Sequence, residues 1–155
     1  RISDFNTSGL VGSREEYNSP WCNLTKSSGA SDKSGSNGGS FGIGKFAPYA
    51  CSSLRTVFYS TSDKEGVCAS QGVSRLTSFK NKKNEITQGT GFYGNDKNSP
   101  MYKQYSLDPV YSRNAEDSGT DIYIVAFTGD RGWQNQMVAS VLDGFLYAIY
   151  NGTLV

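Results

Sequence analysis

The sequence predicts an α+β domain, a two-layer sandwich in which a mixed, mostly antiparallel sheet carries helices on one face. Three segments indicate this class. Residues 120–127 alternate and then run apolar, which is typical of a strand in a sheet. Residues 133–150 place apolar side chains on one helical face, and residues 42–54 show the same helical spacing over a shorter length.

The segment 133–150 is the most regular of the three. Its apolar positions recur for about four turns of helix, and Asn151 and Gly152 supply a C-terminal stop. The side chains on this face are Trp133, Met137, Val138, Val141, Leu142, Phe145, Leu146 and Ile149. The predicted sandwich packs its helices on the sheet.

The sheet is predicted within residues 55–127. Residues 94–118 are polar and contain two prolines, so they are predicted to form a long connection with irregular turns. In the helix that precedes the sheet, Pro48 is tolerable only in the first turn, because proline lacks the backbone N–H of a helix interior. The strand candidates are residues 56–61, 67–73, 74–79, 86–93 and 120–127.

Composition limits the classes of function. A chain of 155 residues predicts one compact domain, residues 1–155. With 15 basic and 14 acidic residues the net charge is +1, so charge implies neither a nucleic acid nor a membrane as partner. Histidine is absent, which removes the commonest general base near neutral pH and the commonest transition-metal ligand. No apolar run approaches the roughly 18 residues that a membrane span needs.

The cysteines predict a reducing environment. Cys22, Cys51 and Cys68 are odd in number, far apart and without a CxxC pair, so neither a disulfide framework nor a zinc site is expected. We expect structural thiols in a cytoplasmic protein. The chain begins Arg-Ile-Ser-Asp without an initiator methionine and closes on what resembles an interrupted strand, so we expect a piece of a longer protein.

Residues 8–39 are rich in Ser, Gly, Asn and Lys and predict a long, partly ordered loop. A loop of this length inside a compact domain is usually disordered or a functional lid. Its apolar anchors are Leu10, Val11, Tyr17, Trp21 and Leu24.

Three glycine-rich stretches match phosphate-binding expressions. Residues 39–46 fit GxxxxGK, but Phe46 stands where a P-loop needs Ser or Thr to hold magnesium, and no hydrophobic strand precedes the stretch. Residues 42–47 imitate a dinucleotide fingerprint and lack the same leading strand. Residues 89–94 are followed by a polar run rather than a helix, so a strand edge is the simpler interpretation.

The interpretation that remains is a glycine-rich loop at the start of a predicted helix near Gly42. Glycines let the backbone approach a polyphosphate, and free N–H groups at a helix start meet its negative charge. Lys45 is equally well explained as a phosphate ligand or as a solvated lysine.

The string GGSFGIGKFAPYA, residues 38–50, resembles the second glycine box of the GHKL ATPases. This superfamily groups gyrase-type topoisomerases, heat-shock chaperones of the ninety-kilodalton class, histidine kinases and MutL-type repair proteins. Residues 4–9 resemble the start of the family's ATP lid, residues 8–39 occupy the lid, and residues 118–120 resemble its late glycine-threonine element. The chain is therefore similar to the later two-thirds of a Bergerat-fold ATP-binding domain.

The resemblance implies a set of nucleotide-binding residues. In the family, backbone amides of the glycine box wrap the phosphates and a threonine on the late strand helps to bind adenine. Thr120 would sit below the base, although without the resemblance it is better explained as a β-favouring surface residue. Asn6 and Gly9 would flank the ribose or phosphates at the hinge of the lid. The phosphate-cradling residues would be Gly39, Ser40, Phe41, Gly42, Ile43, Gly44 and Lys45.

Two family elements have no counterpart in this interpretation. One is the helix whose Glu activates water and whose Asn binds magnesium, and the other is the DxGxG box whose Asp accepts the adenine amino group. ATP with Mg²⁺ is the implied cofactor of the intact domain, and no catalytic or metal-binding residue is assigned in this chain. We expect partners in the nucleotide and the rest of the parent polypeptide, and weak or no ATP binding by the isolated chain.

Two alternatives stay open. A non-catalytic interaction module would keep the Bergerat scaffold, and exposed inner faces of Phe41, Phe46 and Tyr49 would favour a homodimer. A P-loop-like nucleotide-binding protein is the weaker alternative, and under it Phe46→Ser would improve metal-dependent binding.

Overall fold

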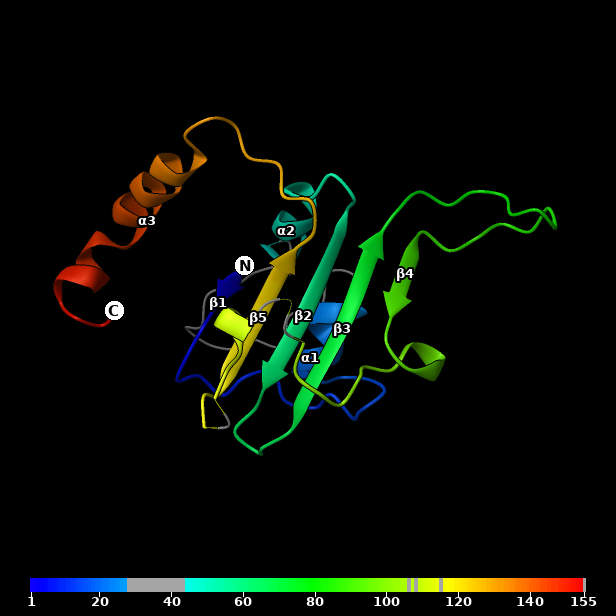
Figure 1. Cartoon of the computed structure of the whole chain (residues 1–155), viewed down its shortest axis with the longest axis horizontal. Coiled ribbons are helices and arrows are strands. Elements are labelled where there is room, and N and C mark those ends of the chain that lie inside the picture. Colours follow the sequence, from blue (N-terminus) through cyan, green and yellow to red (C-terminus); the bar gives the residue numbers. More distant parts are fainter. Residues whose placement is uncertain (28–43, 106, 108, 115, 155) are drawn as a thin grey trace.

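A computed structural model describes residues 1–27, 44–105, 107, 109–114 and 116–154. The described residues form an antiparallel sheet with short helices, an α+β arrangement as the sequence predicts (Figure 1). The strands are β1 Ile2–Ser3, β2 Thr56–Ser62, β3 Cys68–Arg75, β4 Thr90–Tyr93 and β5 Gly119–Ile124. The helices are α1 Pro20–Thr25, α2 Ala47–Ala50 and α3 Trp133–Tyr150, with 3-10 turns η1 Gly44–Phe46, η2 Asp96–Asn98 and η3 Pro109–Tyr111.

Within the described residues the sheet has the order β1-β5-β2-β3-β4, and each of these pairings is antiparallel. The central strand β2 pairs with β3 and with β5, and this register puts Thr61 beside Thr120 and Ser60 beside Asp121. Because side chains alternate along a strand, Thr61 and Thr120 face one side of the sheet, and Ser60 and Asp121 face the other.

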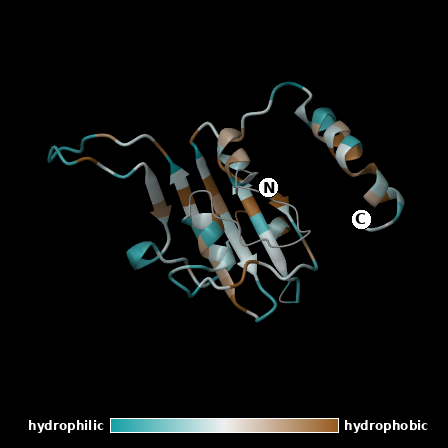
Figure 2. Cartoon of the chain, turned by 180° about the vertical axis from the view of Figure 1, so that it is seen from behind, coloured by the Kyte–Doolittle hydropathy of each residue, from teal (hydrophilic) through white to brown (hydrophobic). Residues whose placement is uncertain are grey.

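The first face of the sheet carries the core. Helices α1 and α2 lie on this face (Figure 2), and Trp21 and Tyr49 from them pack with Val57, Tyr59 and Val73 of the strands. Trp21 has an exposed fraction of 0%. Part of segment 8–39, predicted to be a loop, is therefore a helix in the core.

The residues at the start of helix α1, Ser19 and Pro20, are typical of a helix N-terminus, although a loop was predicted there. Ser19 accepts a hydrogen bond from the backbone N–H of Cys22 at 3.1 Å, and Pro20 follows it in the first turn. Ser at the N-cap and Pro at the first helical position are both favoured at a helix start.

Described residues of the connection 94–118 pack on the opposite face. The Tyr105 ring stacks on Phe58, with centroids 4.7 Å apart, and the Tyr105 N–H donates to the Ser60 hydroxyl at 2.9 Å. Farther along the connection, Arg113 forms an ion pair with Asp121.

The helix predicted over residues 42–54 is shorter in the structure. Pro48 lies in the first turn of α2, as required, but the helix ends at Ala50. The cause is Ser52, whose hydroxyl donates to the Val125 carbonyl at 2.6 Å and accepts from the Thr56 N–H at 3.1 Å. These hydrogen bonds direct the chain toward β2 before the helical apolar pattern of residues 42–54 ends.

Strand boundaries also differ from the prediction. The strand predicted at 67–73 and the first two residues of the strand predicted at 74–79 form one strand, β3, because no turn residue separates them and the pairing with β4 continues to Arg75. Residues 76–79 lie outside it. The strand predicted at 86–93 is confined to β4. The strand predicted at 120–127 is β5, which ends at Ile124.

Helix α3 has the bounds that the sequence predicts, but its apolar face does not pack on the sheet. No residue of α3 is buried, and the helix stands apart from the sheet in Figure 1. Phe145 is 55% exposed and Leu146 62% exposed. Its first residue, Trp133, contacts Phe127 edge to face, with ring centroids 4.9 Å apart. Among the described helices, none has the length and apolarity needed to span a bilayer.

Candidate functional site

The predicted site residues fall into two groups in the structure. Gly39, Ser40, Phe41, Gly42 and Ile43 lie outside the described residues. Of the others, Gly9 and Thr120 lie where β2 ends and β5 begins, whereas Gly44 and Lys45 precede α2 near the opposite end of β2.

Thr120 lies in a buried pair of threonines, not on the surface. Its hydroxyl oxygen is 3.4 Å from that of Thr61 on the neighbouring strand. Thr61 Oγ1 also accepts the backbone N–H of Leu10 at 2.8 Å, so the predicted lid begins by binding the end of β2. Thr61 and Thr120 are 1% and 9% exposed.

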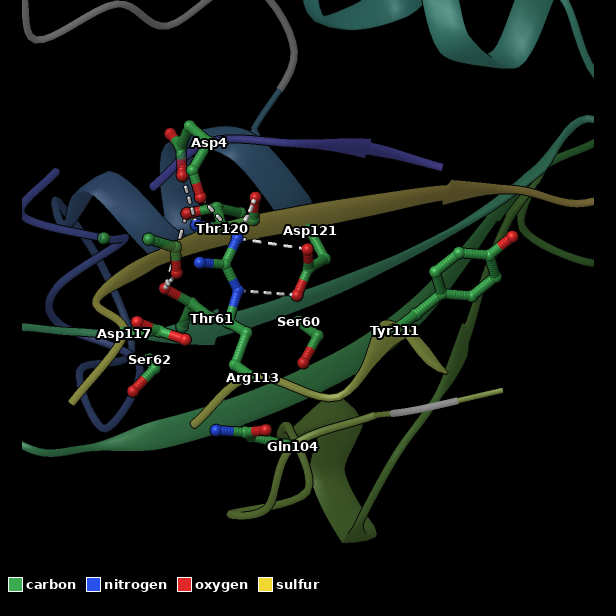
Figure 3. Close-up of polar contacts among 12 residues, drawn as sticks. Asp4, Ser60, Thr61, Ser62, Gln104, Tyr111, Arg113, Asp117, Thr120 and Asp121 are labelled. Carbon is green, nitrogen blue, oxygen red and sulfur yellow. Dashed lines mark hydrogen bonds and ion pairs between the residues drawn. The ribbon is translucent and has the colours of Figure 1, made fainter. Parts of the chain in front are cut away.

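Asp4 is bound directly to Thr120. The Thr120 N–H donates to Asp4 Oδ1, and the Asp4 N–H donates to the Thr120 carbonyl at 3.1 Å. Asp4 is an exposed residue. Figure 3 shows the side chain above Thr120. The Asp4 carboxylate is therefore held at the backbone of Thr120, where β5 begins.

Gly9 is required by close backbone contact at the end of β2. Its φ is +63°, and a Cβ atom would lie 2.6 Å from the Ser62 carbonyl oxygen and 3.0 Å from Thr61 Oγ1. Only glycine fits such a conformation and approach without strain. Asn6 has a φ of +57° and is exposed. The segment between Asp4 and Gly9 thus bends twice as it passes the threonine pair.

Asp4, Gly9, Thr61 and Thr120 together form one corner of the sheet. Arg113 binds this corner from the other face of the sheet. Its Nε donates to Asp121 Oδ2 at 2.8 Å, and its Nη2 donates to the carbonyl oxygens of Asp4 at 2.5 Å and Thr120 at 3.0 Å. The side chains of Arg113 and Asp121 are 2% and 4% exposed. A buried arginine therefore joins the long connection to β1 and β5 (Figure 3).

Gly119 allows Asp4 and Arg113 to approach the start of β5 closely. Its φ is +149°, a Cβ atom would overlap the Asp4 carbonyl oxygen, and it would lie 2.7 Å from Arg113 Nη1. The glycine of the predicted glycine-threonine element is thus explained by the approach of Asp4 and Arg113.

Lys45 makes a contact within the fold. Its ammonium donates to the Asn23 carbonyl oxygen of α1 at 2.6 Å. Burial, and then the charge of Arg75, lower the pKa of Lys45 below its ordinary value. Gly44 before it is exposed, with open space around its Cα.

Phe46 packs against the core, and the Arg75 guanidinium lies 5.2 Å from the centre of its ring. The position that a P-loop would use for a magnesium ligand is therefore occupied by a core contact. A P-loop also belongs to a strand–loop–helix unit, which the described antiparallel pairings do not provide. Among the described residues, no group of three or more acidic or cysteine side chains lies close enough to hold a metal ion.

Sequence reasoning missed two residues of this corner. Asp4 was interpreted as the start of the lid, although an acidic residue directly after a short apolar strand and before Gly9 was a usable signal. Arg113 carried no signal, because it lies in a polar connection without a motif.

Comparison with known proteins adds no relative: no family model, no curated protein and no solved structure matches the chain. The corner formed by Asp4, Gly9, Thr61 and Thr120 is therefore interpreted from its own geometry and from the resemblance in the sequence.

Proposed function

We propose that this chain is the ATP-binding portion of a GHKL-type ATPase, which couples ATP binding and hydrolysis to a conformational change in a larger protein. The observation that supports it is the carboxylate of the exposed residue Asp4, which accepts the backbone N–H of Thr120. In this proposal Asp4 takes the part of the family's aspartate that accepts the adenine amino group, for which the resemblance alone offers no counterpart.

The chemistry of this corner fits adenine better than guanine. An ionised carboxylate only accepts hydrogen bonds, and a hydroxyl both donates and accepts. The Watson–Crick edge of adenine offers an amino donor next to a ring-nitrogen acceptor, whereas guanine offers a carbonyl oxygen where adenine has the amino group. A carboxylate left facing a carbonyl oxygen would lose its hydrogen bond and repel the ligand.

The remaining parts of the nucleotide follow from the resemblance. Gly9 and Asn6 would line the ribose or phosphates, and the glycine box from Gly39 to Lys45 would cradle the phosphates. The described Gly44 and Lys45 lie near the end of β2 opposite to Thr120, and Lys45 donates to the Asn23 carbonyl oxygen, so the box would have to move toward the base for one nucleotide to contact both. No residue of this chain is assigned to activate water, so the proposal for the chain itself is binding. Because Asp4 supplies an acceptor for the base in this proposal, we expect the isolated chain to bind ATP weakly, with a dissociation constant above about 1 µM, rather than not at all.

Titration with nucleotide tests the proposal. ATP should shift the backbone amide resonances of Thr120 and Gly9 in a nitrogen-15 NMR spectrum, and GTP should shift them less at the same concentration. Asp4→Asn should weaken ATP binding by about 10-fold or more, because a hydrogen bond to a charged group contributes roughly 1.5–3 kcal/mol.

A matched control is Asp96→Asn, an exposed aspartate beside β4 at the opposite edge of the sheet. It should leave ATP binding unchanged. Equal shifts with ATP and GTP, or an Asp4→Asn chain that binds ATP as the wild type does, would contradict the assignment of Asp4 to the base.

A non-catalytic interaction module is a second candidate, and helix α3 is the observation that favours it. The helix exposes a continuous apolar surface with Asp143 as its one charged residue. Apolar patches of this kind mark interaction sites on soluble proteins. The surface residues that are at least 40% exposed are Met137, Val138, Val141, Leu142, Phe145, Leu146, Tyr147 and Tyr150.

Light scattering over a range of concentrations tests this candidate. The wild-type chain should gain mass with concentration, and Phe145→Glu should reduce that gain by placing a charge in the apolar surface. Gln134→Glu adds the same charge at an exposed polar position of α3 and should have no effect. A wild-type chain that stays monomeric throughout would count against the candidate.

A further inference from the structure

The connection 94–118 sends one buried side chain, Arg113, to the corner that holds Asp4 and Thr120. We infer that Arg113 is a positioning residue, which fixes the Asp4 carboxylate and the start of β5 for the base of the nucleotide. This inference rests on the proposed function for its consequence in binding.

The guanidinium contacts both chain segments at the corner. Nη2 donates to the carbonyl oxygen of Asp4 and to that of Thr120, while Nε and Nη2 donate to the two carboxylate oxygens of Asp121 at 2.8 and 3.1 Å. A planar guanidinium can form this fork, whereas an ammonium cannot. The Asp121 carboxylate thus orients Arg113, and Arg113 in turn orients the backbone of Asp4.

The residues after Asp4 are held in the same way. The Arg113 guanidinium carbon lies 4.3 Å from the centre of the Phe5 ring, a cation–π contact. The Ser118 hydroxyl donates to the Thr7 carbonyl oxygen at 2.7 Å. Residues on both ends of the loop between η3 and β5 therefore hold the segment that leads from Asp4 to Gly9.

Arg113 acts through the backbone and does not face the proposed ligand. Asp121, its carboxylate partner, faces the side of the sheet opposite to Thr120 and Thr61. The Arg113 side chain is 2% exposed, so a nucleotide bound at the surface of Asp4 would not contact the guanidinium. Its influence on the base is transmitted by the hydrogen bonds to the carbonyl oxygens of Asp4 and Thr120.

A purely structural ion pair is the competing explanation, and Arg113→Lys separates the two. Lysine keeps a positive charge beside Asp121, and Arg1 lies 3.7 Å from the same carboxylate, so the buried charge stays compensated. The single ammonium cannot hold Asp121 and the Asp4 carbonyl in the same geometry. Stability should therefore change little, while the position of Asp4 should change.

Two measurements on the full chain test the inference. The Thr120 amide, which donates to the Asp4 carboxylate, should exchange its hydrogen at least about 10-fold faster in Arg113→Lys than in the wild type. The dissociation constant for ATP should rise by about 10-fold, whereas that for tripolyphosphate, which has no base, should stay unchanged.

Arg55→Lys is the matched control, because Arg55 donates to the Tyr49 carbonyl oxygen near the opposite end of β2 and should affect neither measurement. If Arg113→Lys does not fold, Arg113→Met combined with Asp121→Asn removes both charges together and should show the same two changes.

Each outcome decides between the explanations. Unchanged Thr120 exchange, or equal losses of affinity for ATP and tripolyphosphate, would overturn the positioning role and leave the proposed function standing. A wild-type chain that binds no ATP would overturn both.

Discussion

Trp21 is the residue that decides whether the first part of segment 8–39 belongs to the core or to a mobile cover. Its side chain is fully buried between α1 and the sheet. Truncation of a buried tryptophan to alanine destabilises a protein by about 3–5 kcal/mol. The indole N–H has no hydrogen-bond partner among the described residues, and alanine removes that unfavourable group.

We therefore expect Trp21→Ala to lower the free energy of unfolding by about 3 kcal/mol, near the low end of that range. For a chain of this length the melting temperature should fall by roughly 6–12 °C. Trp21→Phe keeps most of the apolar volume and loses the unpaired N–H, so its effect should stay below about 1.5 kcal/mol.

Urea unfolding followed by far-ultraviolet circular dichroism measures both variants. Trp133→Ala is the control, because Trp133 is half-buried at the start of α3 and should lose about 1 kcal/mol or less. A Trp21→Ala chain within about 1 kcal/mol of the wild type would refute the reasoning. It would mean that residues around α1 contribute no more to stability than a surface loop.

The remaining predictions concern pH and the P-loop alternative. Burial raises the pKa of both Tyr49 and Tyr59, whose hydroxyl groups are 3.2 Å apart. The folded state keeps these protons above pH 10, where unfolded tyrosine ionises, so stability should be flat below about pH 10 and fall above it. Urea unfolding from pH 8 to 11 checks this, and equal stability at both ends would contradict it. Phe46→Ser should lower the free energy of unfolding by about 1–2 kcal/mol without any gain in magnesium-dependent nucleotide binding. A gain in that titration would instead favour the P-loop alternative.

Several residues of the candidate site could be predicted from the sequence, but their arrangement in space could not. Gly9, Thr120 and the glycine before Thr120 were found from the resemblance, and the structure places them around one corner of the sheet. The contact of Asp4 with Thr120 could not be predicted, because it depends on the pairing of β1 with β5, which joins residues more than a hundred positions apart. Lys45 could not be separated from a solvated lysine until its contact with Asn23 was known.

Elements with a local pattern could be predicted from the amino-acid order alone. Helix α3 and strand β5 could be predicted because each keeps one period, helical or alternating, long enough to exclude the other type of element. Pro48 indicated the first turn of α2. Three features required knowledge of the folded chain: residues 68–75 form one strand, Trp21 lies in the core, and α3 exposes its apolar face. The physical reason is that burial and strand pairing depend on segments distant in the chain. Local periodicity indicates which side of a helix or strand is apolar, but it does not indicate which segment of the chain packs against that side.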